Sequence, residues 1–377
     1  MSAIPDGMAP IKTPANLPEL VRSTFNRARA SGDVHFFPTQ VTLVNVNSIP
    51  FQLRFSPALA SKPRAPQPPP PSTDASLQTQ SSTEKKPFFD PFDNPPAAML
   101  ITQLPPSHNL VLNKFAIVPE HFILATQAFK EQTHLLEKAD LEAAYACIEA
   151  YHQYHTRAPD NDTKIAASGV VNDGNGSGEL FVFFNSGAAS GSSQPHRHIQ
   201  MLPVDWMREG LSGEEEAAWA VLAGGLMDDS VRGRVPFQTF AEKIGKGVDL
   251  SGVYGRLYRR ACEAVLGTEG PEVDGQTGEE REARVDYNLA MTRNIMVIAP
   301  RVTEGEAVTA VGDDGERKVL GKLALNGTVL AGTALVKSQA EWDALRAEPE
   351  QLLEILGRIG VPTIRAPSAR FGVGADV

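Results

Sequence analysis

Two histidines and a glutamine that alternate along one short segment have the clearest chemical potential in this chain. His196, His198 and Gln200 occupy every second position of a stretch flanked by apolar residues. Because side chains alternate between the two faces of a β-strand, a strand here places all three on one face, and the intervening residues, Arg197 among them, on the other. Packing alone does not explain three polar side chains in a row, so this segment is the first candidate for a functional site.

The segment before the histidines is a loop of glycine, serine and alanine at residues 186–194, entered from the apolar stretch 180–184. Glycine lets backbone N–H groups converge on an anion, and serine hydroxyls add donors. A neutral imidazole can attack phosphorus while such donors stabilise charge on the phosphoryl oxygens. The Gln200 amide can donate to the same oxygens without a transferable proton. These residue types suit covalent transfer of a phosphate-bearing group through a histidine.

Three other interpretations stay open on the residues alone. Two imidazoles on one strand face can bind zinc, with His121 or His108 as a third ligand. They can instead be hydrogen-bonded structural residues at a sheet end. The glycine-serine loop can also be a plain connector. We prefer covalent transfer because the loop leads directly into the His-x-His-x-Gln pattern.

Composition limits the classes of protein and of partner. The 377 residues suit about two domains, and the net charge of −10 argues against a nucleic-acid partner bound over the whole surface. No apolar stretch approaches 18 residues and no secretory signal is recognisable, so no membrane partner is expected. Cys147 and Cys262 lie in apolar, helix-like contexts. Reduced cysteines of this kind predict a cytoplasmic protein, with the nucleus as a second compartment.

The elements around the motif predict an α+β fold, because strands and helices occur in separate runs. Strands are predicted at residues 36–55, 98–104, 109–118, 165–171, 179–185, 237–244 and 287–300, with a turn at 172–178. Helices are predicted at residues 17–30, 136–155, 205–227, 253–266 and 341–357.

The character of the sequence changes after Pro203, which predicts an N-terminal catalytic domain at 1–204 and a C-terminal domain at 205–377. Residues 61–86 contain four consecutive prolines and a Ser/Thr/Gln tract. Such a composition cannot bury enough apolar surface to offset its ordering entropy, so we predict a disordered insertion there. Residues 267–284, rich in glycine and glutamate, are predicted to be a flexible loop.

Residues 191–200 resemble the histidine-triad superfamily, which includes enzymes similar to galactose-1-phosphate uridylyltransferase, in the branch that ends in Gln. The most similar family is the fungal diadenosine tetraphosphate phosphorylases, also called ATP adenylyltransferases. Residues 50–62, 113–122 and 286–301 resemble further blocks of that family in the same order. The resemblance covers most of the chain outside 61–86 and 267–284. It implies a histidine-triad-like antiparallel sheet with flanking helices, and a C-terminal α+β portion packed on it.

The resemblance also implies a reaction. His198 would attack the α-phosphorus of diadenosine tetraphosphate and form an AMP–histidine intermediate. Inorganic phosphate would then accept the AMP to give ADP, with ATP as the other product, in a reversible reaction. His196 would orient or polarise the site, and Gln200 would hold the phosphoryl oxygens and favour transfer over hydrolysis. Substrate contacts are implied for Lys62, Asn113, Lys114, Asn185, Gly191, Ser192, Ser193, Gln194, Asn288, Thr292 and Arg293.

Several further expectations complete the prediction. Lys114 is expected in the middle of a strand, where an inward lysine needs a partner. No covalent cofactor and no protein metal site are expected, whereas Mg²⁺ or Mn²⁺ should accompany the polyphosphate. The chain is expected to be a monomer. Alternative functions are a dinucleoside polyphosphate hydrolase, an enzyme similar to hexose-1-phosphate uridylyltransferase, or a nucleotide- or zinc-binding regulatory protein without turnover.

Overall fold

The structure is a computed structural model that describes residues 11–58, 90–157, 178–268, 270, 281–312 and 314–363. The predicted insertion at 61–86, which includes Lys62, lies outside the described residues. So do the predicted strand at 165–171, nearly all of the turn at 172–178 and most of the predicted loop at 267–284. Among the helices that are described, none is both long and apolar enough to span a bilayer.

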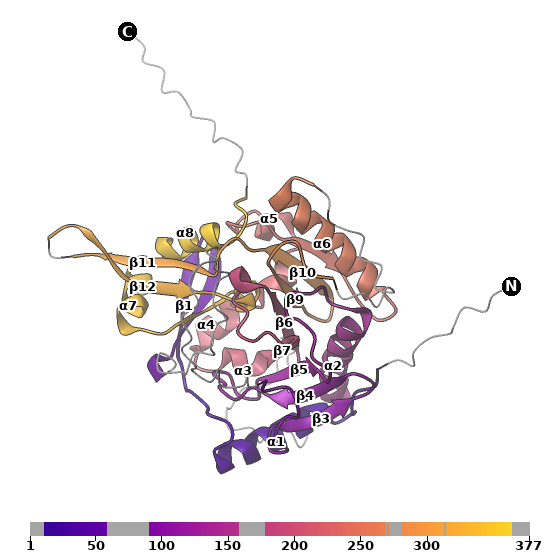
Figure 1. The fold of residues 1–377 in the computed structure, drawn as a ribbon. Helices are drawn as coiled ribbons and strands as arrows, with labels where there is room; N and C mark the ends of the chain where they lie inside the picture. Colours follow the sequence, from indigo (N-terminus) through magenta and orange to yellow (C-terminus); the bar gives the residue numbers. More distant parts are fainter. Residues whose placement is uncertain are drawn as a thin grey trace, which may run out of the picture.

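An eight-stranded antiparallel sheet forms the centre of the molecule (Figure 1). Its strands, in spatial order, are β3 (Leu100–Leu104), β4 (His108–Leu112), β5 (Phe122–Thr126), β7 (His198–Pro203), β6 (Leu180–Ser186), β9 (Tyr287–Met291), β10 (Ile295–Pro300) and β8 (Phe240–Lys243). The pairing of β6 with β9 joins the two halves of the chain. The predicted α+β fold is confirmed, and the C-terminal part continues the sheet across the predicted boundary between residues 204 and 205.

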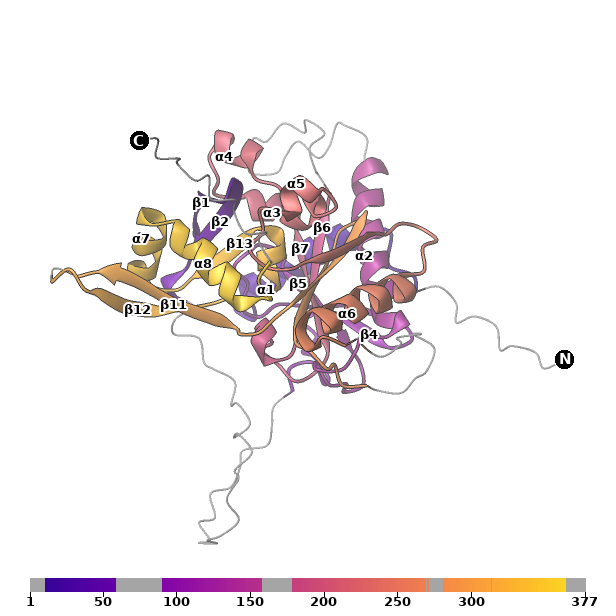
Figure 2. The ribbon, with the colours of Figure 1, turned by 90° about the horizontal axis from the view of Figure 1, so that it is seen from above.

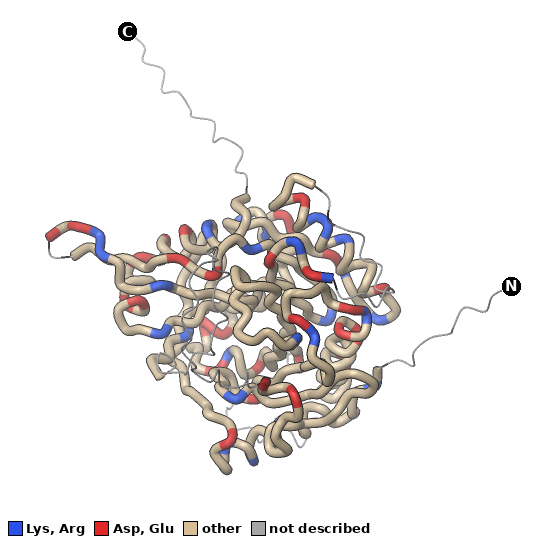
Figure 3. The backbone as a smooth tube through the Cα atoms, in the orientation of Figure 1, with Lys and Arg blue, Asp and Glu red and all other residues tan. Residues whose placement is uncertain are grey.

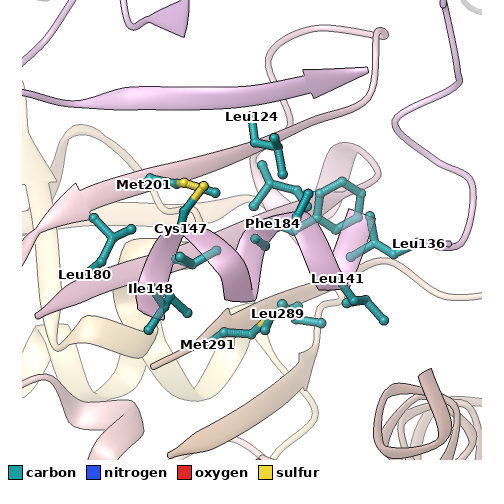
Figure 4. Close-up of a cluster of buried hydrophobic side chains, with 14 of the residues drawn as sticks. Leu124, Leu136, Leu141, Cys147, Ile148, Leu180, Phe184, Met201, Leu289 and Met291 are labelled. Atoms are coloured by element: carbon teal, nitrogen blue, oxygen red, sulfur yellow. The ribbon is translucent and has the colours of Figure 1, made fainter. Parts of the chain in front are cut away.

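Three helices pack on one face of this sheet and enclose the larger core, with α1 (Leu17–Ser31), α2 (Lys138–Arg157) and α6 (Leu250–Leu266). Figure 4 shows the α2 side of this core, where Cys147 faces Phe184 and Met201 of the sheet. Both cysteines are buried and unpaired, as predicted. The central strand β6 is apolar along most of its length because both of its faces are covered.

A second apolar core lies on the other face of the large sheet, beneath a three-stranded sheet of β1 (Gln40–Val46), β2 (Ile49–Phe55) and β13 (Thr333–Val336). In it, β13 runs parallel to β2. The remaining helices are η2 (Ala188–Ser190), α3 (Val204–Arg208), α4 (Gly213–Ala218), η3 (Leu222–Gly225), α5 (Asp229–Arg232), η4 (Gly327–Ala331), α7 (Gln339–Ala347) and α8 (Glu350–Ile359). The hairpin of β11 (Gly305–Val311) and β12 (Arg317–Ala324) projects from the body of the molecule (Figures 1 and 2).

Two predicted helices are wrong in their extent. Residues 205–227 form the short helices α3, α4 and η3, because the chain turns at Gly210, whose φ is +93°. Residues 341–357 belong to two helices, α7 and α8, since Pro349 lacks an N–H donor and separates them. The β11–β12 hairpin was not among the predicted strands.

The other predicted helices and strands that the structure describes form close to their predicted positions, except that β4 ends earlier than expected; β13 and α5 were not among the predictions. The strand predicted at 109–118 stops at Leu112, because the Asn113 side chain accepts a hydrogen bond from the N–H of Phe115 at 2.9 Å and turns the chain. Lys114 therefore lies in an exposed turn, and its predicted mid-strand position is wrong.

Charged residues of both signs are interspersed over the molecule. Figure 3 shows short blue and red segments alternating along the backbone, without an extended region of one sign in this view. An anion that binds on this side would therefore depend on local groups.

Candidate active site

The motif lies where β7 begins, at one end of the large sheet. Ile199 and Met201 point into the core shared with α2, so His198 and Gln200 lie on the opposite face. His196 and His198 are buried, whereas Gln200 is half-buried. The predicted alternation is therefore confirmed at the strand that carries the motif.

The His198 ring is held in one tautomer. Its Nδ1 lies 2.8 Å from the backbone carbonyl oxygen of His196. A carbonyl oxygen only accepts, so Nδ1 carries the proton and Nε2 keeps its lone pair. Burial, and then the charge of His196, lower the pKa of His198 to about 4, although the hydrogen bond to the His196 carbonyl acts in the opposite direction. His198 is thus neutral at neutral pH, with Nε2 as its nucleophilic atom.

The His196 ring is bonded at both nitrogens and is not free to act as a base. Nε2 lies 2.8 Å from the carbonyl oxygen of Thr126 and 2.9 Å from its hydroxyl. Nδ1 lies 2.6 Å from the carboxylate of Asp90. Because the Thr126 carbonyl needs a donor, Nε2 carries a proton, and the contact to Asp90 requires another proton between the two groups. These hydrogen bonds therefore hold the His196 ring in a fixed position beside His198.

A short segment just after residue 89 covers both rings. Phe92 packs against His198 with ring centroids 5.1 Å apart and against His196 at 5.6 Å. The same phenylalanine packs with Val111, Ile123 and Ala125 in a small apolar cluster on this face. The exposed fraction of His198 is only 3% under this cover. The cover explains why burial is the largest influence on the His198 pKa.

Gln132 holds the backbone of the nucleophile in place. Its side-chain oxygen accepts from the N–H of His198 at 2.7 Å, and its side-chain nitrogen donates to the His198 carbonyl at 3.2 Å. The same nitrogen donates to the carbonyl of Asn185 at 2.9 Å. The β6–β7 pairing ends at Gln200, so the buried Gln132 amide bridges the two strands where the loop separates them.

The glycine-serine loop is fixed at two points. Gly187 has a φ of +82°, and a Cβ there would lie 2.0 Å from the Asp286 carboxylate, which accepts from the N–H of Ala189 at 2.6 Å. A Cβ on Gly191, whose φ is +79°, would meet Asn326 at 2.8 Å. The loop therefore requires glycine at both positions and has a defined shape, unlike a plain connector.

The end of this loop presents backbone donors. Within the described part of the chain, the N–H groups of Ser192, Ser193 and Gln194 have no hydrogen-bond acceptor. The Ser192 hydroxyl donates to the Gln194 carbonyl at 3.4 Å. Consecutive N–H groups next to the histidines form the kind of cradle that binds an anion. The geometry thus fits the anion site predicted for residues 191–194.

Asn185 and Asn288, both predicted to contact substrate, are brought together, but their side chains support the glycine-serine loop. The Asn185 side-chain oxygen accepts from the Asn288 amide at 2.9 Å and from the N–H of Gly327 at 2.8 Å. The Asn288 amide also donates to the Ser190 carbonyl at 2.9 Å. Both asparagines are buried, so they tie the loop to β9 and η4.

Four other predicted substrate contacts lie at the opposite end of the sheet. Asn113 and Lys114 follow Leu112, which is level with Met201 in the register through β5. Thr292 and Arg293 follow Met291, which reaches the same level through β6. Met201 is three residues beyond His198, or about 10 Å along the strand. The structure does not bring these four residues to His198.

The two histidines considered as a third zinc ligand, His108 and His121, lie away from the motif. His108 lies 2.8 Å from Asp140 on the α2 side of the sheet, and His121 lies 3.4 Å from the Asn113 amide at the far end. Within the described residues, no group of three or more His, Cys, Asp or Glu side chains could hold a metal ion.

Sequence reasoning missed Asp90, Thr126 and Gln132. None lies close to the motif in the sequence, and the sheet alone brings them to it. Asp90 offered one signal, because it begins the sequence Asp-Pro-Phe four residues after the low-complexity stretch 61–86.

Comparisons with known proteins identify the family of this chain. The model of the Ap4A phosphorylase N-terminal domain matches residues 8–157 and 175–213, which is half of the chain. The model of the ATP adenylyltransferase C-terminal domain matches residues 233–362.

Two curated proteins of Saccharomyces cerevisiae are 25% identical to this chain. Diadenosine 5',5'''-P1,P4-tetraphosphate phosphorylase 2 matches over 83% of this chain and 84% of its own length. Protein APA1 matches over 93% of this chain and 95% of its own length.

The fold matches that of a solved relative. The crystal structure of yeast Ap4A phosphorylase Apa2 aligns with a TM-score of 0.61 and 21% identity, over 92% of this chain and 98% of that one. Its complex with Ap4A aligns with a TM-score of 0.60 and 22% identity over the same shares. This chain belongs to the Ap4A phosphorylase family and is an enzyme of the nucleotidyltransferase type.

Proposed function

We propose that the chain cleaves diadenosine tetraphosphate with inorganic phosphate through a covalent adduct on His198. The observation that supports this most is the single tautomer of His198, whose Nδ1–H is bound to the His196 carbonyl while Nε2 keeps its lone pair. A buried, neutral nucleophile beside backbone N–H groups that have no acceptor among the described residues suits attack on a phosphoryl group.

In the first step, Nε2 of His198 forms a bond to the α-phosphorus, and the bond from that phosphorus to the bridging oxygen breaks. ATP leaves, and AMP remains on the ring. The ring becomes positively charged because Nδ1 keeps its proton, and the hydrogen bond to the His196 carbonyl strengthens accordingly. In the second step, a phosphate oxygen attacks the same phosphorus, His198 leaves as a neutral imidazole, and ADP forms.

The residues around His198 divide the remaining work. The N–H groups of residues 192–194 would receive the phosphoryl oxygens, and the half-exposed Gln200 on the same face as His198 would donate to them. The Gln200 amide can neither deliver a proton to a leaving group nor accept one from water, and this favours transfer over hydrolysis. We propose that Mg²⁺ or Mn²⁺ arrives with the polyphosphate, since the described residues offer no dedicated cluster of ligands.

Product analysis with and without phosphate tests the proposal. Wild-type protein should give ADP and ATP from diadenosine tetraphosphate when phosphate is present, and one equivalent of ATP with an AMP–protein adduct when it is absent. Steady release of AMP without phosphate would instead identify a hydrolase, and a uridylyl adduct formed from a uridine diphosphate hexose would favour the uridylyltransferase-like alternative.

His198→Ala should remove the adduct and lower turnover by roughly 10⁴-fold or more, since the nucleophile is lost. His152→Ala is a matched control, because His152 is a partly exposed histidine of α2 away from the motif. Unchanged turnover in His198→Ala, or nucleotide binding without any turnover in the wild type, would overturn the proposal.

A further inference from the structure

The segment immediately before β3 contributes a largely buried carboxylate to the site. The Asp90 carboxylate lies 2.6 Å from Nδ1 of His196, and the exposed fractions of the two side chains are 12% and 1%. The other oxygen of Asp90 accepts from the N–H of Phe92 at 2.9 Å. Asp90 therefore links the covering segment to the ring of His196.

This contact has a consequence for His198, although Asp90 does not touch it. The tautomer of His198 depends on the position of the His196 carbonyl oxygen, which accepts its Nδ1–H. That carbonyl belongs to a residue whose ring is held from two sides, by Thr126 of β5 and by Asp90. If one side is released, the His196 ring can turn about its side-chain bonds and the peptide that follows it can tilt.

We propose that Asp90 is a positioning residue for the transfer reaction: its hydrogen bond to His196 fixes the carbonyl that holds the nucleophile His198 in its reactive tautomer. This inference rests on the proposed function for its effect on rate, but the tautomer itself can be observed without substrate. The role belongs to the hydrogen bond, because an amide at position 90 can also bond to Nδ1 while Nε2–H still donates to Thr126.

Three variants separate the possibilities. Asp90→Ala removes the bond to His196, whereas Asp90→Asn offers Nδ1 an amide donor in place of the carboxylate acceptor and keeps an acceptor for the N–H of Phe92. Asp93→Ala is the matched control, because Asp93 is an exposed aspartate of the same segment. The readouts are the single-turnover rate of adduct formation on diadenosine tetraphosphate and the His198 tautomer from ¹H–¹⁵N correlations of the protein without substrate. A thermal melt checks the fold of each variant.

Asp90→Ala should slow adduct formation roughly 10- to 100-fold, the usual loss when a group that orients a reacting histidine is removed. Its His198 should show a mixture of the two neutral tautomers where the wild type shows only Nδ1–H. Asp90→Asn and Asp93→Ala should retain the wild-type tautomer and most of the rate. KM should change less than the rate, because Asp90 bonds to His196 and does not touch His198.

Other outcomes would overturn the proposal. A wild-type rate and tautomer in Asp90→Ala would show that Thr126 alone positions His196. An Asp90→Asn protein as slow as Asp90→Ala would show that the reaction uses the carboxylate charge and not the position. A wild-type protein that forms no adduct, yet shows the expected tautomers in all variants, would refute the proposed function and leave the positioning role intact.

Discussion

The side chains of His196 and Arg197 lie on opposite faces of the sheet and have different polar partners. On the sheet face with the nucleophile, His196 meets Asp90 and Thr126. On the opposite face, Arg197 lies 3.0 Å from both Glu137 and Asp140. The contacts of His196 hold the residue whose carbonyl orients His198. The contacts of Arg197 instead tie the start of β7 to the start of α2. In the proposed roles, the hydrogen bond of His196 serves the reaction, whereas the ion pairs of its neighbour Arg197 serve the fold.

The Arg197 side of this comparison should show the largest effect on stability. Arg197 is 1% exposed, and Asp140 beside it also binds His108 at 2.8 Å. Burial raises the pKa of Asp140. The hydrogen bond from His108 and the charge of Arg197 lower it by more, so the pKa is below its ordinary value. Arg197→Met leaves this buried carboxylate without its main counter-charge, so the free energy of unfolding should fall by about 3–5 kcal/mol, as measured by urea denaturation.

A half-exposed ion pair next to this cluster provides the control. Lys130 lies 2.5 Å from Glu137, with exposed fractions of 23% and 32%. Lys130→Met should cost about 1 kcal/mol or less. The comparison fails if Arg197→Met is equally mild, or if it alters the His198 tautomer as Asp90→Ala does.

Gln132 connects the two strands of the site, and its loss should affect both stability and rate. Gln132→Leu leaves the N–H and carbonyl of His198 and the carbonyl of Asn185 without this partner, at a cost of about 2–3 kcal/mol. Adduct formation should slow roughly 10- to 100-fold because the nucleophile is displaced. Gln132→Glu keeps the acceptor for the His198 N–H and should lie between Gln132→Leu and wild type in both measurements.

The cover over His198 should control the pH dependence of the first step. Burial is the main reason that the pKa of His198 falls to about 4, and Phe92 supplies part of that burial. Only neutral His198 can attack, so the wild-type adduct rate should lose its His198-dependent fraction only near pH 4. Phe92→Ala admits water and should raise the pKa towards its ordinary value of about 6.5, which moves the acid limb of the rate upward.

An NMR titration of His198 and the pH profile of adduct formation together measure this shift. Phe129→Ala serves as the control, because Phe129 packs on His196 with centroids 5.3 Å apart and is 48% exposed. It should leave the His198 pKa unchanged. An unshifted pKa in Phe92→Ala would assign the desolvation of His198 to the rest of the site.

How much of the site could be predicted from the sequence depends on how far apart along the chain the interacting residues lie. The alternation of His198 and Gln200 is a local pattern with a period of two, and the structure confirms it. Asp90 lies 106 residues before its partner His196, so only tertiary structure pairs them. The split between α7 and α8 was predictable from Pro349, and the residues Gly-Asp-Asp-Gly at 312–315 are a turn signal for the missed β11–β12 hairpin.

The positions of the outlying substrate residues depend on strand register, which the sequence alone did not define. Lys114 falls within the strand predicted at 109–118, but the Asn113 side chain ends the strand first. Thr292 and Arg293 close the tight turn between β9 and β10, where the Thr292 N–H donates to the Ile295 carbonyl at 3.0 Å. The direction of β9 in the sheet decides which of its ends lies level with His198 across β6, and that is the Tyr287 end.

Arg293 provides the smallest and most discriminating test of that register. The resemblance implies that it contacts substrate, whereas in the structure it binds Glu149 at 2.8 Å and is 44% exposed at the far end of the sheet. Arg293→Ala should therefore change the free energy of unfolding by less than about 1 kcal/mol, the usual value for an exposed pair. It should also leave the rate of adduct formation near wild type, because the phosphorus that reacts lies at the opposite end of β7. A large rise in KM with an unchanged single-turnover rate would mean that a distant part of the substrate reaches Arg293, and a slower adduct rate would contradict the register itself.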